Sequence, residues 1–429
     1  MAQNLINSLV NILDTVMIGR LGTVEIAAVG LGNNFFFLYN MFLFGICSGG
    51  SIFTAQFWGK KDTLGIRKNM GLCALLSLSM AILFTLATLF APELILSVYS
   101  QDKALIPVGA IYLRALSPAF LPYAVSFVCI LTLRSIERVR LTVVSTIIAL
   151  SINLVLNYLF IFGLGAIPAL GVLGAAIATV IARFTEAAIL LIVSYTRRYA
   201  FIGPLRDYAS FSLSFVQRFF RITLPVMLNE VIWSLGVSAQ NIIFARTDTN
   251  AIAAFNITNT VSQLTWVFFI GLGNGAAVLI GKKIGEGNEL EARDYAARIV
   301  CFAPLTAAGA AFVLIPLSQV LPFVFNVNEQ LLRDVTLMLI ILSCSYPFRA
   351  FNMAMIIGIC RAGGDTVFSA IFDVAFMWVV SLPIAAAVSF FFHAPVWLIY
   401  ICICTEEPLK MLVYLWRFKS GKWLRNVTD

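Results

Sequence analysis

Two long apolar stretches decide the fold: residues 24–57 read VEIAAVGLGNNFFFLYNMFLFGICSGGSIFTAQF, and residues 250–280 read NAIAAFNITNTVSQLTWVFFIGLGNGAAVLI. Each stretch exceeds the about 20 apolar residues that cross a bilayer as one helix. Glu25 is the only charged residue in the first stretch, and the second stretch contains none. Both stretches therefore predict membrane-spanning helices.

The composition extends this prediction to the whole chain. Of the 429 residues, 60% are hydrophobic and 12% are charged, whereas soluble domains have roughly 25% charged residues. At about 20 residues per crossing, the chain has room for roughly a dozen spans and for no large domain outside the membrane. The sequence predicts an all-α polytopic membrane protein with twelve spans, near residues 1–18, 24–57, 69–90, 104–133, 141–163, 170–196, 219–245, 250–280, 295–323, 331–360, 366–391 and 395–417. The first span is short, which leaves a truncated first helix open.

The two quoted stretches correspond when the sequence is shifted by 226 residues. Ile26-Ala27-Ala28 then falls on Ile252-Ala253-Ala254, and Gly59 falls on Gly285. Six spans followed by six have the same orientation, which is typical of parallel repeats in transporters. We expect two pseudo-symmetric six-helix bundles, an N-terminal lobe at 1–200 and a C-terminal lobe at 219–429, joined by a cytoplasmic linker at 201–218.

The net charge of +8 reflects how lysines and arginines are distributed between spans. Of the 29 basic residues, twenty-one fall in loops on one side of the predicted topology and four on the other. The positive-inside rule then places both termini in the cytoplasm. We expect no nucleic-acid partner, because these charges are scattered between apolar segments.

Residues for catalysis or transition-metal binding are scarce. The single histidine, His393, follows an apolar run, and the eight cysteines lie almost entirely within apolar segments without metal-ligand spacing. A membrane-embedded enzyme is therefore less favoured than a transporter. We expect no cofactor other than a coupling ion, H⁺ or Na⁺.

Polar side chains inside spans are costly and mark functional sites. In the first span Asn11 and Asp14 share a helix face, and in the fifth span Asn153 and Asn157 do so. Amide and carboxylate oxygens suit a proton or Na⁺, so Asp14, Asn153 and Asn157 form the predicted cation site. Packing by hydrogen bonds between helices is the alternative.

Two carboxylates in the second half, Glu230 and Asp373, also lack an obvious partner nearby in the sequence, as does Asp14. Helical spacing pairs Arg183 with Glu186 and Glu406 with Lys410, so these charges are expected to neutralise each other. Asp365 precedes the eleventh span and is expected to cap it. The predicted substrate cavity between the bundles is assigned to Asn11, Asn34, Asn256, Gln263 and Asp373.

Three segments resemble the multidrug and toxic compound extrusion (MATE) family: residues 9–31, reading LVNILDTVMIGRLGTVEIAAVGL, residues 153–157, reading NLVLN, and residues 361–366, reading RAGGDT. The resemblance covers nearly the whole chain. It implies that Asp14, Asn153 and Asn157 match a cation site of the N-terminal lobe, with Thr179 as a further ligand. It also implies that Glu230 matches a seventh-helix glutamate used for coupling. Many members have aspartate where this chain has Asn157, so the ion preference is open.

The resemblance implies an antiporter in the bacterial inner membrane, driven by H⁺ or Na⁺, that exports organic cations, drugs and other amphipathic compounds by rocker-switch alternating access. We expect a monomer whose partners are small organic cations and membrane lipid. An exporter or flippase of lipid-linked precursors remains an alternative. The intramembrane acids favour cationic cargo over the pyrophosphate that such a flippase would hold.

Overall fold

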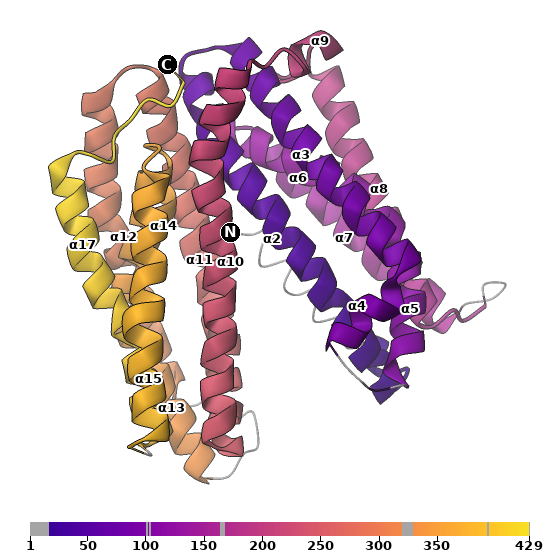
Figure 1. The fold of residues 1–429 in the computed structure, drawn as a ribbon, viewed down its shortest axis with the longest axis vertical. Coiled ribbons are helices and arrows are strands. Elements are labelled where there is room, and N and C mark those ends of the chain that lie inside the picture. The colour runs from indigo at the N-terminus through magenta and orange to yellow at the C-terminus, as the bar shows by residue number, and fades with distance from the viewer. Residues whose placement is uncertain are drawn as a thin grey trace. The chain divides into compact units, whose positions relative to one another are not determined.

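The computed structural model describes residues 17–99, 102, 104–163, 168–319, 329–392 and 394–428, and every regular element in these ranges is helical (Figure 1). Ten helices or helix runs in these ranges are long and apolar enough to cross a membrane. The prediction of an all-α polytopic membrane protein is confirmed.

The helices of the first half are α2 (Thr23–Gly59), α3 (Thr63–Phe90), α4 (Pro92–Tyr99), α5 (Leu105–Leu116), the 3₁₀ turn η1 (Ser117–Ala119), α6 (Phe120–Ser135), α7 (Val139–Phe162), α8 (Val172–Thr196) and α9 (Leu205–Tyr208). The predicted fourth span is α5 and α6 joined by η1. Pro118, which lies in η1, has no N–H to donate within the helix. The short helices α4 and α9 were not predicted.

The helices of the second half are α10 (Leu213–Thr247), α11 (Thr249–Gly285), α12 (Glu289–Leu317), α13 (Glu329–Met353), η3 (Ala354–Arg361), α14 (Thr366–Ala375), η4 (Phe376–Ser381), α15 (Leu382–Phe390), α16 (Val396–Cys404) and α17 (Glu406–Ser420). Both η3 and η4 are π-helical. The predicted twelfth span is divided into α16 and α17 at Thr405. The predicted first span lies almost wholly outside the described residues.

The chain forms two compact units, Met1–Thr54 with Asp62–Phe219 and Ala55–Lys61 with Phe220–Asp429. The last turns of α2 therefore belong to the second unit. Gln56 is fully buried there, and its amide donates to the carbonyl oxygens of Ala362 (2.9 Å) and Arg425 (3.2 Å). Its Oε1 accepts the Val427 N–H at 2.8 Å. One side chain thus holds α2 against the C-terminal tail.

The ends of α2 and α11 cross at two glycines without room for side chains. A Cβ atom on Gly59 would overlap the carbonyl oxygen of Lys282, and one on Gly285 would overlap that of Gln56. Lys282 stands 226 residues after Gln56, as Gly285 does after Gly59. The contacts are therefore reciprocal and follow the register of the repeat.

The predicted linker is anchored to the first unit. Arg67 on α3 makes an ion pair with Asp207 on α9 at 2.8 Å, and the Tyr208 hydroxyl donates to the Phe201 carbonyl at 2.6 Å. Gly71 lies against the Tyr208 backbone, where a Cβ would overlap it. These contacts fix α9 against α3 before α10 begins.

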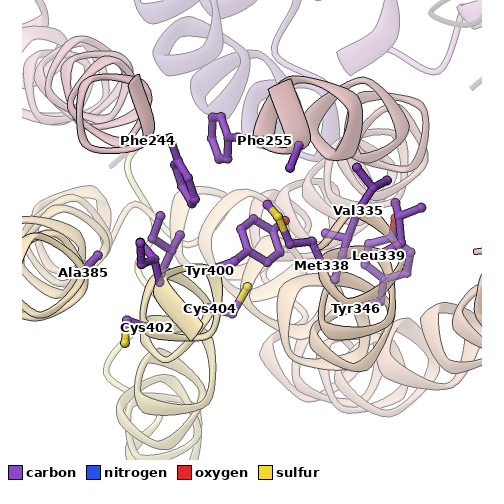
Figure 2. Close-up of a cluster of buried hydrophobic side chains, with 14 of the residues drawn as sticks. Phe244, Phe255, Val335, Met338, Leu339, Tyr346, Ala385, Tyr400, Cys402 and Cys404 are labelled. Atoms are coloured by element: carbon purple, nitrogen blue, oxygen red, sulfur yellow. The ribbon is translucent and has the colours of Figure 1, made fainter. Parts of the chain in front are cut away.

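Each unit has a core of aromatic and aliphatic side chains. In the first unit the buried Tyr39 ring packs edge-on against Phe120 at 4.9 Å, and its hydroxyl donates to the Phe120 carbonyl at 2.7 Å. In the second unit Phe244 and Phe255 stack at 4.4 Å, and Tyr400 meets Phe255 edge-on (Figure 2). Each core thus contains a buried tyrosine, Tyr39 or Tyr400, that packs against phenylalanine rings. A buried tyrosine hydroxyl needs a hydrogen-bond partner, and this requirement favours one arrangement of the helices.

Candidate functional site

In the first unit, α7 and α8 bring three of the predicted site residues together. The amide of Asn157 donates to Asn153 Oδ1 at 3.3 Å, and the amide of Asn153 donates to Thr179 Oγ1 at 3.3 Å. Asn153 and Asn157 are 6% and 2% exposed. The one-turn spacing of the asparagines puts both amides on the face of α7 that packs against α8.

A second polar contact joins the same two helices two turns away. Thr146 on α7 donates to Glu186 on α8 at 2.9 Å, and Arg183 makes an ion pair with Glu186 at 3.1 Å. The Arg183 guanidinium also lies 4.7 Å from the centre of the Tyr123 ring. The predicted neutralisation of Arg183 by Glu186 is confirmed, so this charged pair leaves the Asn153 group free of net charge.

The group formed by Asn153, Asn157 and Thr179 is a set of neutral oxygen and amide groups. Such groups can coordinate Na⁺ or hydrogen-bond a protonated carboxyl, but they need an anionic partner to hold a cation firmly. Asp14 is the predicted partner. Asp14 and Asn11 both lie outside the described residues, so their positions remain predictions.

In the second unit, Glu230 on α10 is not isolated. Its Oε1 lies 2.7 Å from Nη2 of Arg361, the last residue of η3. The same Nη2 donates to Asn229 Oδ1 at 3.0 Å. The pair is almost sealed, with side chains 16% and 5% exposed. Arg361 was counted with the loop charges, but the structure places it in a buried ion pair.

Asp373 on α14 continues this network. Its Oδ2 accepts the Asn229 amide at 3.0 Å, and its Oδ1 lies 2.8 Å from the Lys410 ammonium. Glu406 Oε2 lies 3.5 Å from the same ammonium, which confirms the expected neighbour on α17. An unbroken chain of contacts therefore runs from Glu230 through Arg361, Asn229, Asp373 and Lys410 to Glu406; we name it the charged chain.

As expected, Glu230 and Asp373 have no partner nearby in the sequence, and their cations, Arg361 and Lys410, come from distant positions. The expected capping by Asp365 was wrong, since its carboxylate makes no capping bond to α14. It accepts two hydrogen bonds from Arg417, at 2.7 and 2.9 Å. Two parallel N–H···O bonds from a guanidinium are stronger than one cap in a buried place.

The charged chain adjoins the two π-helical segments. Arg361 ends η3, and Asp373 precedes η4 by less than one turn. Short π-helical insertions in α-helices occur frequently at functional sites.

The other predicted cavity residues are less enclosed. Asn34 on α2 and Asn256 and Gln263 on α11 are all exposed in the described structure. Trp233 and Trp266 stack in parallel at 5.5 Å on the same two helices, α10 and α11, that carry Glu230 and Gln263. These polar and aromatic groups are available to contact a ligand at the unit's surface.

Sequence reasoning missed Asn229, Arg361 and Lys410 as members of a site. The sequence holds a signal for two of the three: Arg361 follows the apolar run of residues 353–360, and Lys410 lies within a predicted span. A cation inside a span needs an anion from another helix as well as from its own. That rule would have paired the cations with Glu230 and Asp373.

The fold and the buried polar groups define a polytopic α-helical membrane protein with charged side chains paired within its helices. The sequence profile of the MatE family matches residues 1–159 and 225–387. The chain belongs to the MatE family, as the resemblance predicted.

Relatives match nearly end to end. The chain is 24% identical over 419 residues to "Uncharacterized transporter YisQ" of Bacillus subtilis, covering 96% of this chain and 90% of that protein. It is 22% identical over 428 residues to "Probable multidrug resistance protein NorM" of Thermotoga maritima, covering 99% and 90%. An outward-facing multidrug resistance MATE family transporter of the MOP superfamily has the same fold, with a TM-score of 0.88, 20% identity and coverage of 98% and 94%. MATE in the straight conformation has a TM-score of 0.87, 20% identity and coverage of 97% and 93%.

Proposed function

We propose that this chain is a multidrug efflux antiporter that exports organic cations and related amphipathic compounds in exchange for H⁺ or Na⁺. Membership of the MatE family and the names of the relatives, which include multidrug resistance proteins, support the transport of drugs. Exchange by rocker-switch alternating access is the mode expected of duplicated bundles.

One observation carries the coupling part of the proposal: the buried Asn153 and Asn157 and the partly buried Thr179 converge as uncharged groups between α7 and α8. With Asp14 as the anion, this cluster would bind H⁺ or Na⁺ as the predicted cation site. Since an ion drives transport only if it binds the two states unequally, the ion must favour one arrangement of the first helix. The cargo must favour the other arrangement of the first helix.

Glu230 is proposed to take part in coupling by exchange. Because its carboxylate is paired with Arg361, an incoming ion or organic cation can bind only by displacing that guanidinium. Asp373 would respond in the same way through Lys410. Both carboxylates are therefore proposed as exchange points rather than vacant ion sites.

The cargo is proposed to contact Asn11, Asn34, Asn256, Gln263 and Asp373, with Trp233 and Trp266 as stacking surfaces for flat cations. We propose a monomer in the bacterial inner membrane with both termini in the cytoplasm. Because Arg361 is buried, it no longer counts among the basic residues of the loops. Twenty basic loop residues then lie on the predicted cytoplasmic side and four on the other side, so the predicted orientation is unchanged. No cofactor beyond the coupling ion is proposed.

Ethidium efflux from proteoliposomes tests this function. The purified protein is reconstituted, and efflux is followed under an imposed pH gradient in one arm and an imposed Na⁺ gradient in the other. We expect uphill efflux in one arm, which names the ion. No efflux in either arm from folded protein would contradict the proposal for cationic cargo.

Asp14→Asn is expected to abolish gradient-driven efflux while the protein still folds, since asparagine keeps the shape but cannot gain or lose a charge. Asp102→Asn is the matched control, because Asp102 lies exposed in the connection after α4. It should leave the efflux rate unchanged. Full uphill efflux by Asp14→Asn would refute coupling at this position.

A further inference from the structure

The charged chain contains more acid than base at its α17 end. Asp373 and Glu406 both lie at ion-pair distance from one ammonium, that of Lys410, at 2.8 and 3.5 Å. Two carboxylates that share one cation leave one negative charge over. All three side chains are buried, with residue exposures of 8%, 7% and 3%, and an uncompensated buried charge is strongly unfavourable.

The geometry places the surplus on Glu406. Asp373 is satisfied by the closer contact to Lys410 and by the Asn229 amide. Glu406 Oε2 is buried and accepts no hydrogen bond from any described residue. Its contact with Lys410 is an ion pair by distance alone, longer than a charge-assisted hydrogen bond.

Neighbouring cations are engaged by other acids. Arg361 binds Glu230 at 2.7 Å, Arg349 lies 3.4 Å from the Glu407 carboxylate, and Arg417 binds Asp365. Glu230, Glu407 and Asp365 therefore each have a cation of their own, and Asp365 has a second one in Arg425. Among the described residues, Lys410 is the one cation within ion-pair distance of Glu406, and it is shared with Asp373.

We propose that Glu406 is a proton-binding residue of the second unit. A proton needs one carboxylate oxygen, and its addition converts the carboxylate to a neutral carboxyl group without breaking any other bond. Na⁺ needs several oxygens around it, and the described residues contain no group of three or more acids, histidines or cysteines that could hold a metal ion.

The proton is linked to Glu230 through the charged chain. With Glu406 neutral, Lys410 is held by Asp373 alone, and Asp373 keeps the Asn229 amide that positions Arg361. With Glu406 ionised, Lys410 is shared between two carboxylates, so its ion pair with Asp373 is weaker. The weaker pair then changes the contacts of Asp373 with Asn229 and of Asn229 with Arg361. Glu406 thereby acts as a positioning residue for Arg361 and Glu230; this role rests on the proposed function, whereas proton binding does not.

Infrared difference spectroscopy during a pH titration tests the proposal on the reconstituted protein. We expect the C=O band of a protonated buried carboxyl in the wild type, and loss of one carboxyl equivalent in Glu406→Gln. Glu407→Gln is the matched control, because its neighbouring carboxylate is paired with Arg349, and it should keep the band. An unchanged band in Glu406→Gln would overturn the proposal.

Two further arms keep the result decisive. In an Asp14→Asn background, the band assigned to Glu406 should persist, which separates this site from the proposed coupling site of the first unit. If Glu406→Gln fails to fold, the wild type alone decides: a carbodiimide that reacts with protonated buried carboxyls should label Glu406, found by peptide mass spectrometry. Absence of any protonated carboxyl band in the Asp14→Asn protein would refute the proposal, whatever the ethidium assay shows.

Discussion

Lys410→Met is expected to lower the free energy of unfolding by about 3–5 kcal/mol, the cost of removing one partner from a buried ion pair. Methionine fills similar volume but leaves Asp373 without its cation at 2.8 Å. The measurement is thermal unfolding in detergent, followed with a thiol-reactive dye. Cys360, Cys402 and Cys404 are buried in the same unit, so they report its unfolding.

Lys419→Met is the matched control for this loss. It makes the same substitution on the same helix at an exposed position, where surface changes usually stay within about 0.5 kcal/mol. Adding Asp373→Asn to Lys410→Met should restore part of the stability, because the unpaired charge is gone. Equal melting temperatures for Lys410→Met and Lys419→Met would show that the buried pair does not stabilise the unit.

Gly285→Ala is expected to destabilise the second unit by about 1–3 kcal/mol or more, the cost of forcing extra atoms into a packed site. The new Cβ would overlap the Gln56 carbonyl, which is backbone and cannot rotate away. The loss should appear as a lower melting temperature in the same dye assay. Gly59→Ala should behave alike, because its Cβ would overlap the Lys282 carbonyl.

Gly275→Ala separates this effect from helix propensity. Gly275 lies on the same helix, and nothing stands within 4 Å of a Cβ built there. Alanine favours a helix over glycine by up to about 1 kcal/mol, so this variant should be as stable as the wild type or more so. A similar loss for Gly275→Ala and Gly285→Ala would contradict the role of the close crossing.

Hydropathy predicted the spans because each is set by local composition. The quoted stretch 24–57 became α2, and 250–280 became α11, each within a few residues at its ends. The π-helical segments were not predicted: η3 contains no proline, and Pro383, two residues after η4, was not taken as a signal. A π-helical turn depends on what packs around it, which no short window of sequence records.

The same limit explains the site. Arg183 with Glu186 and Lys410 with Glu406 were predictable, because a helix brings residues three or four apart together. Arg361 lies 131 residues from Glu230, and Lys410 lies 37 from Asp373, so only the packing of helices could join them. The convergence of Asn153 and Asn157 followed from helical spacing, whereas the place of Thr179, which contacts Asn153, came through the family resemblance.

The crossing of α2 and α11 also bears on how the chain arose. Gly59 meets Lys282 and Gly285 meets Gln56, so the same two positions of the repeat face each other in both directions. Ala55 and Gly281, also 226 residues apart, would touch at 2.9 Å if Gly281 had a Cβ. Reciprocal contacts of this kind are the pattern expected if two copies of a half-length sequence pair with each other. At these positions each half of the chain limits the side chain that the other half can carry.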